Sequence, residues 1–152
     1  MSKEIKISID NLNDITNNYN KNIIKEEFDN YLVGQCTFIK NENIILSISG
    51  FYDENNKERL KKTIHNYYNN KLDELRKIDK IDTFKRIVLM TLGIILIIIS
   101  KMFNQVISEV FLVAGWVAIW ETVYNLLFVE TKRKRNFKIY KKIANSNIKF
   151  EN

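Results

Sequence analysis

This 152-residue chain has two long apolar stretches, and charged side chains lie inside or beside them. These charged side chains are the residues most able to bind ions or ligands. Glu121 lies within the apolar stretch at 106–129, where an ionised carboxylate costs roughly 2 to 3 kcal/mol if it is central in a bilayer. Glu109 lies near the start of the same stretch, and Lys101 lies near the end of the preceding one at 87–103. Because a charge in such a place needs a partner or water, these residues are the first functional candidates.

An antiparallel pairing of the two stretches brings opposite charges together. A turn centred near Asn104 places Glu121 within reach of Arg86, and the same register sets Glu109 opposite Lys101. Two interpretations follow for Glu121. It forms an interhelical ion pair with Arg86 that fixes the register of the hairpin, or it contributes to a ring of carboxylates in an oligomeric pore.

Other residue types exclude several kinds of site. His65 is the single histidine and Cys36 the single cysteine, so one chain cannot build a histidine-based zinc site, a cysteine tetrad or an internal disulfide. The spacing around His65 supplies no orienting partner for a nucleophile, which favours an ordinary histidine on a helix surface. The four glycines stand singly, so no phosphate-binding loop is expected. We therefore expect no cofactor, no metal and no enzymatic activity.

A run of basic residues follows the second apolar stretch directly. It begins with Lys132, Arg133, Lys134 and Arg135 and continues to Lys142. In isolation such a run could bind nucleic acid, but its position beside an apolar stretch favours anionic lipid head groups instead, with each charge worth about 1 kcal/mol near the surface. The net charge of +6 is concentrated in the same regions. We expect a lipid partner here and no nucleic acid.

The two apolar stretches have the length of membrane spans. At about 1.5 Å per residue, 87–103 reaches roughly 25 Å, which is short for a bilayer unless Lys101 extends outward to the head groups. The alternative, a buried helical hairpin of a soluble protein, is disfavoured because so small a chain has few apolar partners to cover both helices. Lysine and arginine flank both inner ends, and the turn offers only Lys101. This bias predicts the inner (cytoplasmic) membrane of the cell with both termini cytoplasmic.

The remaining sequence predicts a small α/β domain. Alternation at 4–9 and 44–49 indicates two strands, and a third is expected around Ile148 and Phe150. Helical spacing from Asn22 indicates a helix that a glycine, Gly34, ends. A long helix begins near Asn55 and continues through Arg86 into the first span, since no breaker intervenes.

These elements define a fold class and its division. We expect an α-helical membrane hairpin of two transmembrane helices, with a small cytoplasmic mixed α/β domain built from both termini. The cytoplasmic segment covers 1–86, the hairpin covers 87–129, and a basic helix with a short strand covers 130–152. No charge-free apolar core occurs at 1–14, so no signal peptide is expected and the first span acts as the insertion signal.

Small residues predict the contact between the spans. Ala114, Ala118 and Thr122 recur every four residues in the second span, with Gly115 beside them, and Gly93 is the corresponding small residue of the first span. Such faces allow close helix approach in membranes. The face serves either the intrachain packing of the hairpin or self-association of two chains.

One short run also carries a resemblance. The run G-W-V-A-I-W at 115–120, followed by an aromatic stretch, a basic segment and a final short strand, resembles a family of uncharacterised bacterial two-span membrane proteins over about half of the chain. The resemblance implies a two-span membrane protein and no particular activity. Relatives often carry Arg-Pro after the second tryptophan, where this chain has Glu121 and Thr122, so a shared role for that position does not carry over.

Together these patterns indicate a non-enzymatic integral membrane protein with a cytoplasmic interaction or sensing domain and an unidentified protein partner. The alternative is an oligomeric pore or membrane-permeabilising effector, in which the hairpins form a homo-oligomer. An enzyme ranks third, because no catalytic constellation occurs.

Overall fold

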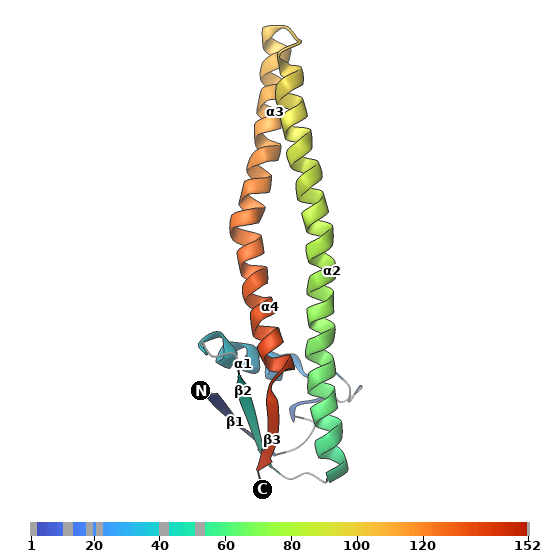
Figure 1. The fold of residues 1–152 in the computed structure, drawn as a ribbon, viewed down its shortest axis with the longest axis vertical. Helices are drawn as coiled ribbons and strands as arrows, with labels where there is room; N and C mark the ends of the chain where they lie inside the picture. Colours follow the sequence, from blue (N-terminus) through green and yellow to red (C-terminus); the bar gives the residue numbers. More distant parts are fainter. Residues whose placement is uncertain are drawn as a thin grey trace. The chain divides into compact units, whose positions relative to one another are not determined.

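The computed structural model describes residues 3–10, 14–17, 20, 23–39, 43–50 and 54–151. The chain divides into two compact units (Figure 1). The first unit comprises Met1–Glu74 and Asn136–Asn152, and the second comprises Leu75–Arg135. The first is a small α/β fold, and the second is a pair of long apolar helices.

Three strands of the first unit form one sheet among the described residues. Strands β1 (Lys3–Ile9), β2 (Ile44–Gly50) and β3 (Asn147–Glu151) lie in the order β1-β2-β3, and both neighbouring pairs are parallel. Ile5, Leu46 and Ile148 occupy one row across the sheet. The three expected strands are confirmed, and those from the two ends of the chain belong to one sheet.

One face of this sheet forms the core of the first unit. Ile5, Ile7 and Ile9 of β1 alternate with exposed residues and are buried. Helix α1 (Glu26–Thr37), the first part of α2 (Glu54–Ser100) and the end of α4 (Glu130–Ala144) supply the rest of the core. Their fully or almost fully buried side chains include Phe28, Leu32, Leu60, Ile64, Tyr68, Ile139 and Ile143. Helix α2 contributes through one stripe of residues four positions apart, as expected for an amphipathic helix.

On the two outer strands the other face of the sheet is polar, whereas on β2 the same face holds half-buried Ile45 and buried Ser47. Glu4, Lys6 and Ser8 of β1 are exposed, and so are Lys149 and Glu151 of β3. The hydroxyl of Ser47 on β2 donates a hydrogen bond to the Glu4 carboxylate, and this bond lowers the pKa of Glu4. All-parallel sheets are usually covered on both faces. An exposed polar face is therefore an unusual property of this small sheet.

Helix α1 differs from the sequence-based expectation at both ends. It begins at Glu26, after Lys25 at the N-cap position, and the expected start at Asn22 lies outside the described residues. It also continues past Gly34 to Thr37, so the expected stop at Gly34 is wrong. The reason is conformational: Gly34 does not have the positive φ with which glycine terminates a helix.

The second unit consists of two antiparallel helices (Figure 1). Helix α2 runs without interruption from Glu54 to Ser100, which confirms the expected continuity through Arg86. After a short turn, α3 (Gln105–Tyr124) returns, followed by a π-helical segment η2 (Asn125–Val129) and the first turns of α4. Both helices are long and apolar enough to cross a membrane. The π-helical segment inserts extra residues per turn and changes which side chains face α2.

Candidate functional site

Small residues form a close contact between α2 and α3. Gly93, Gly115 and Ala118 are buried, although most side chains of these helices are exposed. A Cβ atom added at Gly93 would lie 2.9 Å from the Gly115 carbonyl oxygen and 3.2 Å from the Ala118 Cβ. The reciprocal atom at Gly115 would lie 2.8 Å from the Gly93 carbonyl oxygen. The two backbones thus touch within one chain, while Ala114 is exposed and lies outside this contact.

The turn between the two helices packs against α3 through aromatic rings. Phe103 and Phe111 stack with centroids 5.1 Å apart and planes inclined by 17°. Lys101 and Glu109 are both exposed, and within the described part of the chain no ion pair joins them. The sequence-based prediction that Glu109 lies opposite Lys101 therefore does not result in an ion pair.

Arg86 has a different partner from the one expected. Its guanidinium donates to the carboxylate of Glu130 and also to the Thr83 hydroxyl at 2.8 Å. The Glu130 carboxylate also forms an ion pair with the Lys134 ammonium group, with 2.6 Å between Oε1 and Nζ. Hydrogen bonds from Lys134 and Arg86 lower the pKa of the Glu130 carboxyl. The Arg86 and Glu130 side chains are each 14% exposed, so this pair is well shielded from solvent.

The expected Arg86–Glu121 ion pair is accordingly wrong in this structure. The Glu121 carboxylate instead accepts a hydrogen bond of 2.8 Å from the Asn125 side-chain amide on its own helix. A register counted on a straight α-helix omits the π-helical segment between Glu121 and Glu130, which rotates the residues after it relative to α2. Arg86 pairs with Glu130, the first residue after this segment.

A second ion pair binds α4 to α2 nearby. The guanidinium of Arg133 donates to Asp79 at 2.9 Å and to Asp82 at 2.8 Å, and its side chain is only 11% exposed. Lys132 and Arg135 are exposed. The four residues expected to face lipid therefore differ: Arg133 is shielded by its ion pairs, whereas Lys132, Lys134 and Arg135 are exposed, although Lys134 also pairs with Glu130.

A cavity of about 300 Å³ lies between the helices beside these pairs. Its lining residues are Asp82, Lys85, Arg86, Leu89, Glu121, Asn125 and Arg133. The four from α2 follow the spacing i, i+3, i+4 and i+7 of one helical face. Arg86, Arg133 and Asp82 are already paired. Among the described residues, Lys85 and Glu121 are the lining charges without an ion-pair partner, and both are exposed at the cavity.

Sequence reasoning found part of this site. It selected Arg86, Glu121 and Arg133, but it missed Asp82, Lys85 and Glu130. The spacing of Asp82, Lys85 and Arg86 on one face of α2, directly before the first apolar stretch, was a usable signal. The role of Glu130 depends on the π-helical segment, for which the sequence offers no comparable sign.

The first unit contains a buried polar network of its own. Asp29 on α1 is buried and accepts hydrogen bonds from the Tyr68 hydroxyl, at 2.8 Å, and from the Lys71 ammonium group. The Lys71 nitrogen also lies 4.9 Å from the ring centroid of Tyr67 and 5.3 Å from that of Tyr140. These contacts join α1, α2 and α4 at one point of the core.

Burial and charge shift the ionisation of this network. Burial raises the pKa of Tyr68, and the neighbouring Asp29 charge raises it further. Burial alone would lower the pKa of Lys71, but the hydrogen bonds to Asp29 and Tyr67 outweigh it, so the pKa is raised. The ammonium and carboxylate thus stabilise each other inside the fold. Since the partners are about 40 residues apart, local sequence patterns did not indicate them.

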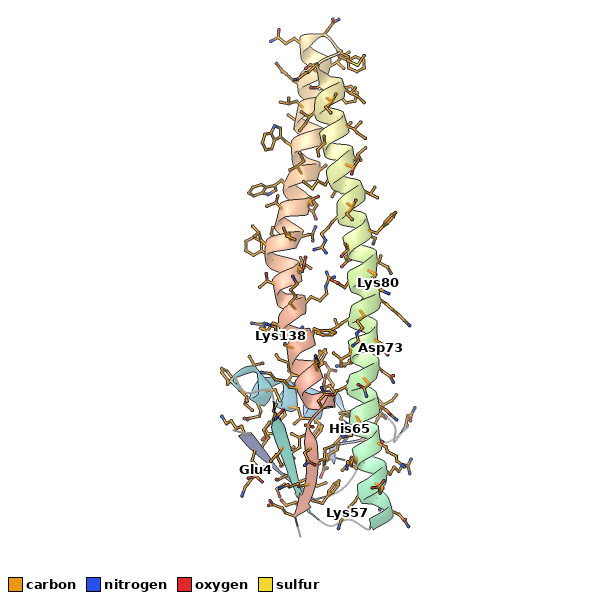
Figure 2. All side chains as sticks on the ribbon, viewed as in Figure 1. Glu4, Lys57, His65, Asp73, Lys80 and Lys138 are labelled. Carbon is orange, nitrogen blue, oxygen red and sulfur yellow. The ribbon has the colours of Figure 1, made fainter. Side chains whose placement is uncertain are left out.

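His65 and Cys36 have structural positions. The Nδ1–H of His65 on α2 (Figure 2) donates to the Ala144 carbonyl oxygen at 2.6 Å, and a carbonyl can only accept, so this nitrogen carries the proton. Burial raises the pKa of the Cys36 thiol to about 11, which makes it a poor nucleophile at neutral pH. Among the described residues, no group of three or more histidine, cysteine, aspartate or glutamate side chains could hold a metal ion.

Comparisons with known proteins leave the site to be interpreted from its own residues. No protein-family model, no curated protein and no solved structure matches this chain. The cavity of the second unit therefore stands as the candidate functional site on its geometry alone. The cavity can offer a ligand the ammonium group of Lys85 and the carboxylate of Glu121. The ion pairs of Arg86 and Arg133 lie beside these two groups.

Proposed function

We propose that this chain is a non-enzymatic integral membrane protein, held in the inner membrane by α2 and α3 and acting through its α/β unit. The observation that carries the proposal is the exposure of apolar side chains in the second unit. In the most apolar stretch of each helix, only 11% and 17% of the residues are buried. A core helix of a soluble protein would be mostly buried, and soluble proteins rarely expose apolar patches beyond a few hundred Å².

The exposed residues suit contact with acyl chains. They surround both helices and include Ile87, Val88, Ile94, Ile95, Ile98, Val110, Val113, Val117, Leu126 and Leu127. Trp116, Trp120 and Tyr124 are exposed along one stripe of α3. Tryptophan and tyrosine favour the membrane interface, so this stripe supports a membrane orientation with the aromatic end near the head groups.

The α/β unit is proposed as the interacting or sensing part, on the cytoplasmic side with both termini. The basic flanks of the spans support this orientation. The exposed polar face of the parallel sheet supports a protein partner, because such sheets are normally covered on both faces. The ligand of this face is not a nucleic acid in our proposal, since Glu4 and Glu151 place negative charge beside Lys6 and Lys149.

The proposal is tested by locating both ends of the chain. A compartment-specific reporter fused to either terminus of the full chain should report the cytoplasm, and the protein should remain with membranes after alkaline extraction. An external location of either terminus, or release of the protein by alkaline carbonate, would contradict the proposal. Cross-linking at the polar sheet face should then capture a partner that the Lys6→Glu and Lys149→Glu variant loses.

A pore or membrane-permeabilising effector is the second candidate. The observation that favours it is the exposed Glu121 carboxylate at the edge of the apolar region, because assembly of several chains would shield this charge from lipid. Mass photometry in detergent should then show a defined oligomer, and liposomes should show ion flux whose selectivity changes in Glu121→Gln. A monomer without flux would exclude this candidate.

A further inference from the structure

We infer that the cavity of the second unit binds the head group of a phospholipid that carries a primary ammonium group, of the phosphatidylethanolamine type. The inference rests on the proposed membrane location. It depends on Lys85 and Glu121, the two lining charges that have no ion-pair partner in the described part of the chain, and on their opposite signs.

The first step identifies which charged groups of the cavity lining are available to bind a ligand. Arg133 is held by Asp79 and Asp82, and Arg86 is held by Glu130 and Thr83. These four contacts give both arginines carboxylate or hydroxyl partners within the protein. Lys85 and Glu121 also line the cavity and are exposed, and the Glu121 carboxylate accepts a hydrogen bond from a neutral amide, that of Asn125.

The second step matches these charges to a ligand. A head group of this type has a phosphate diester and an ammonium group joined by two carbons, so it carries both complementary charges within a few bonds. The phosphate fits Lys85, assisted by the guanidinium of Arg86, and the ammonium fits Glu121. An isolated cation or an isolated phosphate would satisfy only one of the two.

The third step concerns selectivity. Each N–H of a primary ammonium can donate to the Glu121 carboxylate, whereas the trimethylated nitrogen of a choline head group has no N–H to donate. A glycerol head group has no positive charge at all. Loss of one such hydrogen bond corresponds to about a threefold to tenfold change in affinity. The cavity should therefore distinguish head groups that differ only in methylation of the nitrogen.

The experiment uses the full chain in detergent and a series of lipids with identical acyl chains. Native mass spectrometry would measure the affinity for phosphatidylethanolamine, its N-methyl and N,N-dimethyl derivatives, and phosphatidylcholine. We expect affinity to fall along this series, by about threefold to tenfold between its ends. Equal affinities along the series would overturn the inference without any mutation. Water-soluble glycerophosphoethanolamine should bind far more weakly, and equal binding of it would overturn the assignment to a lipid.

Two variants and two matched controls assign the roles of the residues. Glu121→Gln keeps the shape of the side chain and should abolish the preference for the primary ammonium. Lys85→Gln should weaken all members of the series to a similar degree and keep their order. Glu109→Gln and Lys132→Gln remove exposed charges that do not line the cavity. They should change neither the affinity for the lipids nor the preference for the primary ammonium. A preference that survives in Glu121→Gln would overturn the inference.

Flotation of the protein with liposomes separates this inference from the proposed function. Failure to float after alkaline extraction would refute both the membrane location and the lipid site. Stable flotation together with equal affinity for the methylated lipids would refute the lipid site alone.

Discussion

Substitution of Gly115 provides a quantitative test of the packing between α2 and α3. A Cβ atom at this position would lie 2.7 Å from Ile97 Cγ1 and 2.8 Å from the Gly93 carbonyl oxygen. Ordinary contacts between nonbonded carbon atoms are about 3.5 to 4.0 Å. The helices would therefore have to separate by roughly 0.5 to 1 Å even for alanine. The backbone oxygen cannot move away alone, because it belongs to a helical hydrogen-bond ladder.

The expected loss of stability follows from this displacement. Overpacking of a well-packed contact costs about 1 to 3 kcal/mol, and we expect Gly115→Ala near the lower limit and Gly115→Leu at or above the upper one. Ala114→Leu is the matched control, since it introduces the same side chain one position away at an exposed site. We expect this control to change stability by less than about 0.5 kcal/mol.

Thermal unfolding in detergent, followed by tryptophan fluorescence, would measure these differences. Trp116 and Trp120 lie on the same helix and report on its packing. The reasoning is refuted if Gly115→Leu unfolds at the same temperature as Ala114→Leu. A second control, Gly34→Ala in α1, has nothing within 4 Å of the added Cβ and should stabilise the chain by about 0.5 to 1 kcal/mol through helix propensity.

Three further predictions concern other contacts. Asp29→Asn should destabilise the chain by about 2 to 4 kcal/mol, because it leaves the Lys71 charge without its partner, and adding Lys71→Met should restore part of the loss in a denaturant titration. Burial raises the pKa of the Cys36 thiol from 9.0 to about 11. Alkylation of Cys36 below pH 9 should therefore be about 100-fold slower than in denaturant and should accelerate as the pH rises toward 11. Equal rates in the folded and denatured chain would contradict the burial of this thiol. Arg133→Gln should destabilise the helix pair by about 1 to 2 kcal/mol and Lys132→Gln by less than about 0.5 kcal/mol, and similar thermal shifts for both would show that the Arg133 ion pairs do not contribute.

The sequence predicted those parts of the structure that depend on local periodicity. Alternation of Ile5, Ile7 and Ile9 identified β1 and its buried face, and the absence of proline allowed α2 to be traced as one helix. Small residues at Gly93 and Gly115 identified the contact between the helices before any coordinates. Each of these features is encoded within a few neighbouring residues, and for this reason the sequence alone was sufficient.

Other parts depend on information that is not local. The end of α1 was wrong because the conformation of Gly34 is set by its surroundings rather than by glycine itself. The partner of Arg86 was wrong because a π-helical segment alters the register between Glu121 and Glu130. The Asp29–Tyr68–Lys71 network joins residues that only the folded chain brings together.

The most direct test of the membrane hairpin is the accessibility of its turn in intact cells. In a Cys36→Ala background, single cysteines would replace Asn104 in the turn and Lys132 after the second helix. A membrane-impermeant maleimide should label the cysteine at position 104 in intact cells, and should label the one at position 132 only after the membrane is opened. Labelling of both positions in intact cells, or of position 104 only after lysis, would contradict a hairpin that spans the membrane with both termini inside.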